Sequence, residues 1–239
     1  MTAMKSSRSH RLASRVVPLS RGLDTRDRVL HVALSLFADR GYRGTSLRDI
    51  AKRIGIKAPS LLHHFPSKQQ LYLAVLEQIF NAMEDSARLI MASPGGPQEQ
   101  MCKAIADSID FIARKPDAMK LLSKEFADES GVGRTVMKRR LPPLNAIGVN
   151  FIIRGQREGA FRSELDAFNF LQTLNSIITG YFTTAAVVKR LWNVNLFDPK
   201  SIEHRKREVI DMVERTLFVD GAKARSLGRQ IPRSNIPAP

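Results

Sequence analysis

Hydrogen-bond donors and small side chains lie close together between Lys57 and His64, in the segment KAPSLLHH. A lysine ammonium can donate to guanine O6 or N7, a serine hydroxyl can contact a base or a phosphate, and an alanine methyl can pack against a thymine methyl. Lys57, Ala58 and Ser60 supply these three groups within a short stretch. The segment therefore has the chemistry needed to contact DNA bases, where one well-made contact is worth about 1–3 kcal/mol of discrimination.

No catalytic or metal-binding pattern competes with this interpretation. His63 and His64 are adjacent, and on a helix their side chains would point about 100° apart, which disfavours one shared metal ion. His10, His31 and His204 have no histidine or cysteine at ligand spacing. The sequence contains neither G-x-S-x-G nor H-E-x-x-H, so we expect no metal, no cofactor and no enzymatic activity.

The elements that would position these donors are two short helices joined by a tight turn, over residues 46–65. The first helix has one apolar stripe at helical spacing, formed by Leu47, Ile50, Ala51 and Ile54. Gly55 follows at once, where a helix ends most easily in the left-handed region. Pro59 suits the first turn of a second helix, and Pro66 ends that helix at Phe65. This pattern predicts a helix-turn-helix, which lays its second helix in the major groove of DNA.

The residues around this motif resemble the TetR-type family of transcriptional regulators. The resemblance begins with RVLHVALSLFADRGYRGTSLRDIAKRIGI, which starts at Arg28, and continues without gaps through the block HHFPSK, which ends at Lys68. Two positions depart from the family pattern. Lys57 stands where the family usually has a small hydroxyl residue that caps the recognition helix, and Leu62 stands where it usually has a tyrosine that contacts a phosphate.

The resemblance implies that the recognition helix reads bases, while residues around it bind phosphates and fix the position of the protein. Leu61 is expected to pack in the core. The predicted DNA-binding residues are Arg43, Thr45, Ser46, Arg48, Lys57, Ala58, Ser60, Leu62, His63, His64 and Lys68. Among them, His63, Lys68, Arg43, Thr45 and Arg48 are assigned to phosphates.

Basic charge is concentrated toward the two ends of this chain, whose formal net charge is +15. Residues 1–66 contain 13 Lys and Arg against 4 Asp and Glu, a net charge of +9. Residues 67–221 contain 21 against 19, a net charge of +2, and residues 222–239 contain 4 against none. This distribution is expected for a phosphate-binding face. A purely solubilising role is the alternative.

Cysteine and hydropathy patterns favour a cytoplasmic, nucleoid-associated protein. Cys102 is the single cysteine, so no intrachain disulfide can form. Residues 1–23 lack the apolar run of a signal peptide; a disordered basic arm is favoured over an organelle transit segment. The uncharged run 167–188 is 22 residues long but includes 8 polar residues, so it is interpreted as a buried helix rather than a membrane span.

The whole chain is predicted to be all-α, with about nine helices. They are expected over 24–40, 46–54, 58–65, 68–91, 98–114, 117–129, 144–158, 166–190 and 199–219. Pro142 and Pro143 are expected to kink or stop a helix before Leu144. The predicted organisation is a disordered basic arm (1–23), a TetR-type DNA-binding domain (24–84), a helical effector-binding and dimerisation domain (85–221) and a disordered basic tail (222–239).

By the same resemblance, the second domain would bind a small-molecule effector, whose identity the sequence does not give, in an apolar pocket with a few polar groups. The predicted pocket residues are Met101, Ile105, Met119, Phe126, Asn150, Phe151, Arg154, Asn175 and Thr179. Ordinary core packing is the alternative for each of the apolar members.

The last two helices would form a homodimer through a four-helix bundle. Their apolar stripes are Leu171, Leu174, Ile178, Phe182 and Ala185 on one helix, and Val209, Met212, Val213 and Leu217 on the other. The same stripes could instead serve the core of one subunit.

The sequence therefore predicts a sequence-specific transcriptional regulator that binds double-stranded DNA at a palindromic operator. It is expected to be a repressor that leaves the operator when its effector binds. The alternatives are a constitutive or architectural DNA-binding protein without an effector and an all-helical enzyme.

Overall fold

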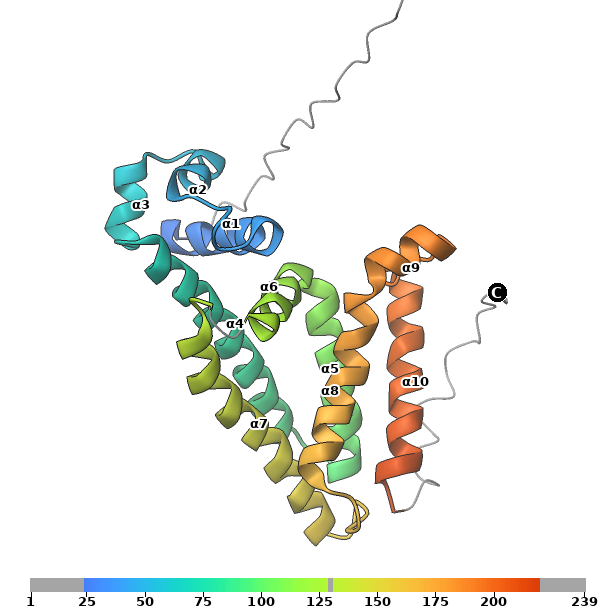
Figure 1. Ribbon diagram of the computed structural model, residues 1–239. Helices are drawn as coiled ribbons and strands as arrows, with labels where there is room; N and C mark the ends of the chain where they lie inside the picture. The colour runs from blue at the N-terminus through green and yellow to red at the C-terminus, as the bar shows by residue number, and fades with distance from the viewer. Residues whose placement is uncertain (1–23, 129–130, 220–239) are drawn as a thin grey trace, which may run out of the picture.

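The structure, a computed structural model, describes residues 24–128 and 131–219. The arm expected over residues 1–23 and the tail expected over 222–239 lie outside the described residues. Ten helices follow one another in the described part: α1 (Thr25–Arg40), α2 (Leu47–Ile54), α3 (Ala58–His64), α4 (Lys68–Met91), α5 (Pro97–Arg114), α6 (Pro116–Ala127), α7 (Arg134–Arg157), α8 (Ala167–Thr183), α9 (Ala185–Trp192) and α10 (Pro199–Leu217). The all-α class is confirmed. Figure 1 shows α1 to α3 as a small head at one end of a larger helical bundle.

α1 is the central helix of the head. Its buried stripe includes Val29, Ala33 and Phe37, none of which is exposed. These residues recur at the spacing of one helix face, so α1 packs against α2, α4 and α6 together. The rings of Phe37 and Tyr72, from α1 and α4, meet edge to face at 4.8 Å between centroids.

α4 connects the head to the bundle without a break. Its first half packs on α1 through buried Leu71 and Val75, and α7 packs alongside it. Arg140 of α7 forms ion pairs with two carboxylates of α4, at 3.6 Å to Glu77 and 3.3 Å to Glu84. A movement of α4 in the bundle would therefore also displace the part of α4 that packs on α1 in the head.

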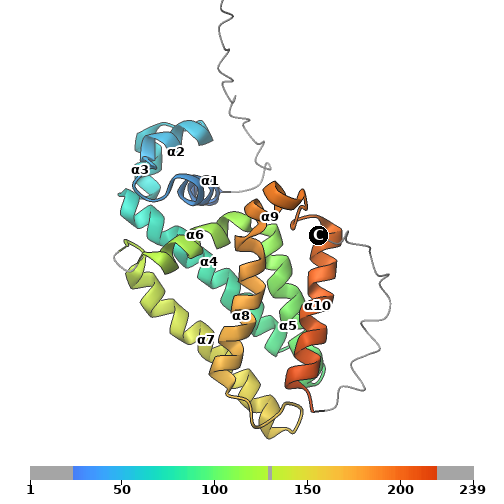
Figure 2. The ribbon, with the colours of Figure 1, turned by 45° about the vertical axis from the view of Figure 1, so that its right-hand side comes forward.

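α5 lies at the centre of the bundle, in contact with α4, α6, α7, α8 and α10. Its buried face is made by Ile105, Ile109 and Ile112. Figure 2 shows α5 between α8 and α10. α8 and α10 are also joined directly, because the Tyr181 hydroxyl donates to the Ser201 carbonyl at 3.4 Å.

Pro142 and Pro143 were predicted to kink or stop a helix, with the next helix starting at Leu144, and α7 shows that they do not stop it. The helix begins at Arg134 and continues through both prolines to Arg157. Two consecutive prolines remove two intrahelical N–H donors. Packing of α7 on both α4 and α8 maintains the helix despite this loss.

The single helix expected over 166–190 is two helices, α8 and α9, that meet at Thr184. The hydroxyls of Thr183 and Thr184 donate to the Gly180 carbonyl at 3.0 and 3.1 Å. Such side-chain bonds compete with the helical backbone and favour a bend. Among the described residues, no helix combines the length and apolar character that a membrane crossing requires.

The apolar stripes predicted for dimerisation pack in the core of the chain's own bundle. On α8, Leu174, Ile178 and Phe182 are buried, and on α10, Val209 and Val213 are buried. These residues belong to the same continuous core as α5. The structure therefore favours the alternative for these stripes, and the faces of α8 and α10 that remain exposed lie on the other side of each helix.

Cys102 on α5 provides a test of burial. Burial and the Glu214 carboxylate, whose Oε1 lies 3.8 Å from the sulfur, raise the pKa of the thiol to about 12. At pH 8 the folded protein then holds far less of the reactive thiolate than the unfolded chain does, so a disulfide reagent should react at least about a hundredfold more slowly with the native protein. Reaction with Ellman's reagent with and without urea measures this ratio; equal rates would contradict it.

Candidate DNA-binding site and ligand cavity

The turn between α2 and α3 has helix-turn-helix geometry. Gly55 ends α2 with φ 79° and ψ 31°, a left-handed conformation that glycine adopts without a Cβ penalty. Its N–H and that of Ile56 both donate to the Ala51 carbonyl at 3.0 Å. Pro59 lies in the first turn of α3, where its missing N–H costs little. The predicted motif is confirmed.

A capping box fixes the start of α2. The N–H and hydroxyl of Ser46 donate to Asp49 Oδ2 at 3.1 and 2.6 Å, and the Asp49 N–H donates back to Ser46 Oγ at 3.1 Å. The bonds from Ser46 hold the pKa of Asp49 below its usual value. The Ser46 hydroxyl, predicted to contact DNA, is thus also part of the helix cap.

α3 lies at the end of the molecule remote from α5, α8 and α10 (Figures 1 and 2). Lys57, which precedes the helix, and Ser60 and His63 within it are exposed. Leu61 is fully buried, as predicted, and Leu62 is 43% exposed. The other predicted residues on this side of the head are the exposed Arg43 and Arg48 and the half-buried Ala58 and His64.

Two residues assigned to phosphates have partners within the head. Thr45 is 2% exposed, and its hydroxyl donates to the carbonyls of Gly41 (2.9 Å) or Leu36 (3.2 Å). The Lys68 ammonium donates to the Thr45 carbonyl at 3.0 Å and lies 4.3 Å from the centre of the Tyr42 ring. The Thr45 side chain therefore faces inward, which corrects its assignment as a phosphate ligand, and Lys68 holds α4 against the α1–α2 turn.

A cavity of about 510 Å³ lies in the bundle, lined by α4, α5, α6, α7 and α8. Its volume is within the usual range of small-molecule sites, about 300–1,000 Å³. It is lined by seven of the predicted pocket residues: Met101, Ile105, Met119, Phe126, Phe151, Asn175 and Thr179. The predicted residues thus come together around one space.

Asn150 and Arg154, also predicted for the pocket, are not part of the cavity wall. Both are exposed on α7, and the Arg154 guanidinium donates to Gln100 Oε1 at 2.6 Å. Five polar wall residues were missed: Ser86, Ser108, Asn145, Gln172 and Ser176. The last two could have been found from the sequence, because together with Asn175 and Thr179 they recur at the spacing of one helix face.

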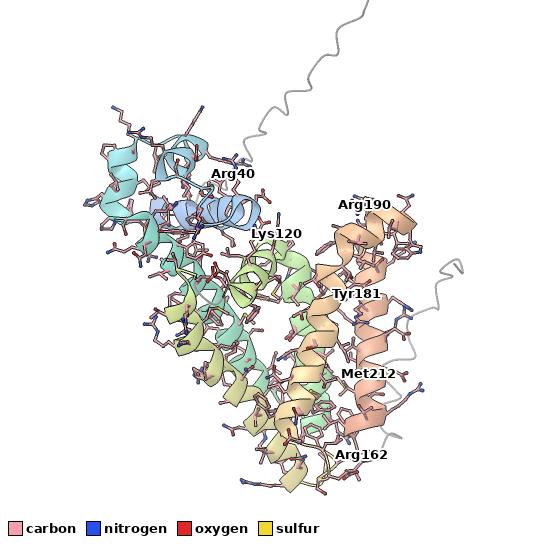
Figure 3. The ribbon with its side chains drawn as sticks, in the orientation of Figure 1. Arg40, Lys120, Arg162, Tyr181, Arg190 and Met212 are labelled. Atoms are coloured by element: carbon pink, nitrogen blue, oxygen red, sulfur yellow. The ribbon has the colours of Figure 1, made fainter. Side chains whose placement is uncertain are left out.

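α6 contacts both the cavity and the head. Met119 and Leu122 line the cavity. From the same helix, the Lys120 ammonium pairs with Asp39 of α1 at 2.5 Å and lowers the pKa of that carboxyl, and the Lys124 ammonium donates to the Ala38 carbonyl at 2.6 Å. Figure 3 shows Lys120 next to the head.

A hydrogen bond from the Tyr72 hydroxyl to the Glu125 carboxylate joins α4 to α6. Burial, together with this carboxylate, raises the pKa of Tyr72, so the hydroxyl keeps its proton across the physiological range. Because α6 also forms hydrogen bonds to α1, a ligand that displaced the cavity-lining residues of α6 would act on the head through both α1 and α4.

An exposed helix-turn-helix on a helical head, with a cavity in the attached bundle, defines a DNA-binding transcriptional regulator. The family model for bacterial regulatory proteins of the tetR family matches residues 29–75, and the model for the tetracyclin repressor-like C-terminal domain matches residues 97–213. The chain belongs to the TetR family.

Curated relatives include both repressors and an activator. The HTH-type transcriptional repressor KstR2 of Rhodococcus jostii (strain RHA1) is 31% identical over 157 residues, 62% of this chain and 74% of KstR2. The HTH-type transcriptional activator FasR of Mycolicibacterium smegmatis is 30% identical over 114 residues, 47% of this chain and 52% of FasR.

Among solved structures, the ketosteroid transcriptional regulator KstR2 of Mycobacterium tuberculosis has a TM-score of 0.62 with 22% identity. The match covers 86% of this chain and all of that one. At this level of identity the similarity concerns the fold.

Proposed function

We propose that the protein is a homodimeric repressor that binds a roughly palindromic operator and is released by a small molecule held in the cavity. The observation that carries this proposal is that one helix, α6, both lines the cavity and is bonded to the DNA-binding head. A ligand in the cavity therefore has a mechanical path through α6 to α1 of the DNA-binding head.

Two copies of α3 would occupy successive major grooves, about one helical turn apart or somewhat more. Lys57, Ala58 and Ser60 would read base edges, while Arg43, Arg48 and His63 would bind phosphates. Ligand entry would displace α4 and α6 and change the separation of the two heads. A coupling of about 1–3 kcal/mol would lower operator affinity several-fold to about a hundredfold.

The dimer would use the outward faces of α8 and α10, since the apolar stripes of both helices are occupied within the subunit. On α8 the exposed face outside the cavity wall includes Thr173, and on α10 the exposed face includes Glu208 and Asp211. These faces lie side by side because Tyr181 and Arg205 join the two helices. We infer an interface with a substantial polar share.

Selection of bound fragments from genomic DNA, followed by titration of a fluorescent operator against random DNA, tests sequence-specific recognition. Strong preference for the selected fragment supports the proposal. Equal affinity for random DNA would favour an architectural DNA-binding protein. Operator affinity that does not change with any added ligand would favour a constitutive DNA-binding protein. A promoter–reporter assay of the selected site then separates a repressor from an activator.

Lys57→Ala is expected to reduce discrimination between operator and random DNA by about 1–3 kcal/mol, because Lys57 would donate to a base edge. Arg48→Ala is the matched variant: Arg48 is exposed on α2, and its loss should weaken both DNAs about equally. Fluorescence anisotropy with both DNAs measures the two effects. If both variants weakened operator and random DNA alike, the assignment of Lys57 to bases would fail.

As a regulator, the protein would act by binding rather than by catalysis and would work at the nucleoid in the cytoplasm. The two domains would divide at about residue 84, with residues 24–84 holding DNA and the remaining helices holding ligand and partner. Since α4 spans this boundary, the domains would move as coupled parts rather than as independent units.

A further inference from the structure

The cavity wall is distinguished by the absence of formal charge. Its described lining residues include no aspartate, glutamate, lysine, arginine or histidine. Most of the wall is aliphatic, aromatic or thioether, with four methionines: Met83, Met91, Met101 and Met119. Methionine side chains are flexible and polarizable, so such a wall adapts to apolar ligands of different shapes.

Four of the seven polar wall residues lie on α8, and the other three are Ser86 on α4, Ser108 on α5 and Asn145 on α7. Gln172, Asn175, Ser176 and Thr179 lie on one face of α8, at successive helical positions. The hydroxyls of Ser176 and Thr179 donate to α8 carbonyls at 2.9 and 2.8 Å, so their protons are already used. Their oxygens remain available as acceptors.

Amide side chains supply the free donors. Asn145 on α7 and Gln172 and Asn175 on α8 line the cavity, and none of the three side chains hydrogen-bonds to another group in the described parts of the chain. An amide offers both a donor and an acceptor, which suits a carbonyl or a hydroxyl of a ligand. It does not provide the opposite charge that a buried carboxylate, phosphate or ammonium would need.

Charged side chains line a smaller, separate cavity of about 310 Å³, which shares only Phe126 and Leu141 with the larger one. Its wall includes Glu125 and Asp128 together with Arg134 and Lys138. Carboxylates and cationic groups are thus mixed there, so this space shows no preference for either sign of ligand charge.

We propose that the effector is an uncharged, predominantly apolar molecule with a hydroxyl or carbonyl group that meets the amides of Asn145, Gln172 and Asn175. This inference rests on the proposed function, because it assigns the ligand class of the effector cavity. Transfer of an unpaired ionised group into such a wall is strongly unfavourable, since no counter-charge replaces its hydration.

Two fluorescent probes that share one ring system test the charge preference. N-phenyl-1-naphthylamine is neutral, and 8-anilino-1-naphthalenesulfonate adds a sulfonate to the same rings. The full-length protein is expected to bind the neutral probe at least about tenfold more tightly. Competition by 1-decanol and decanoate, which differ in their head group, should show the same order.

Variants assign the binding to the cavity. Ala104→Phe fills space on α5 and should abolish neutral-probe binding, whereas Ala146→Phe, at an exposed position of α7 outside the cavity wall, should leave it unchanged. Ala87→Phe on α4 is a second filling variant if the first fails to fold by circular dichroism. Asn175→Leu should weaken competition by 1-decanol by about two- to tenfold, and Asn169→Leu, exposed on α8 outside the wall, should not.

The outcomes separate this inference from the proposed function. Equal binding of both probes, with both lost in Ala104→Phe, would overturn the exclusion of charge and leave the effector cavity in place. Probe binding unchanged by both filling variants would overturn the assignment of this ligand class to this space. Absence of any probe binding would count against a ligand-binding cavity and so against ligand release itself.

Discussion

Leu61→Ala is expected to destabilise the head by about 2–5 kcal/mol and to abolish operator binding. Leu61 is the one buried residue of α3, and its side chain is fully enclosed. α3 has seven residues, too few to remain helical without tertiary contacts. Loss of the Leu61 side chain would therefore leave the recognition helix without its packing contact and would also lower the stability of the head. Thermal denaturation by circular dichroism and anisotropy with operator DNA measure the two effects.

The adjacent residue provides the matched control. Leu62 is 43% exposed, so Leu62→Ala should change the free energy of unfolding by no more than about 0.5 kcal/mol. Any loss of DNA affinity in that variant would then report a contact with DNA rather than loss of structure. If Leu61→Ala unfolded at the same temperature as the unchanged protein, the proposed anchoring of α3 would be wrong.

Operator affinity is expected to fall by about a thousandfold or more between 50 and 200 mM salt. A dimer with roughly six or more phosphate contacts releases that many counterions on binding, and a loss of about 10³–10⁵ follows. The head supplies the required cations: Arg40, Arg43, Arg48, Lys52, Arg53 and Lys57 are exposed. Titrations at a series of salt concentrations give the slope of log affinity against log salt.

Arg48→Ala should reduce the magnitude of this slope by about 2 for the dimer, since each subunit loses one phosphate contact. Arg157→Ala is the control, because Arg157 is exposed at the end of α7 farthest from the head (Figure 1). A salt-independent affinity, or equal slopes for the two variants, would contradict the proposed phosphate-binding face.

Features set by a few neighbouring residues were predictable from the sequence. The Ser46–Asp49 capping box, the left-handed Gly55 and the start of α3 before Pro59 each depend on contacts within one turn of chain. Short-range geometry leaves little freedom there, so residue type and spacing determine the conformation.

Features that depend on tertiary packing could not be predicted from the sequence. An apolar stripe such as Leu174 and Ile178 shows which face of a helix is buried, but the same stripe can face a partner or the subunit's own core. The choice of Asn150 instead of Asn145 for the cavity is an error in the rotation of α7, because five residues along a helix turn the side chain by about 140°. The sequence alone gives no reference for that rotation.

The direction in which a side chain points could not be predicted from the sequence either, even within a recognised motif. Thr45 belongs to a recognisable pattern, yet its hydroxyl turns to the carbonyls of Leu36 and Gly41 instead of outward. Lys68 has the charge of a phosphate ligand and is directed onto Tyr42. A pattern names residues that matter but does not separate those that hold the head together from those that touch DNA.

Because the apolar stripes of α8 and α10 are enclosed within one chain, each subunit can complete its folding before it meets another. In the proposed dimer, pairing would then be a later, reversible step whose extent depends on how many copies the cell contains. Occupancy of a two-fold symmetric operator would consequently rise more steeply than in proportion to protein concentration, so the abundance of the protein would itself set a threshold for gene control.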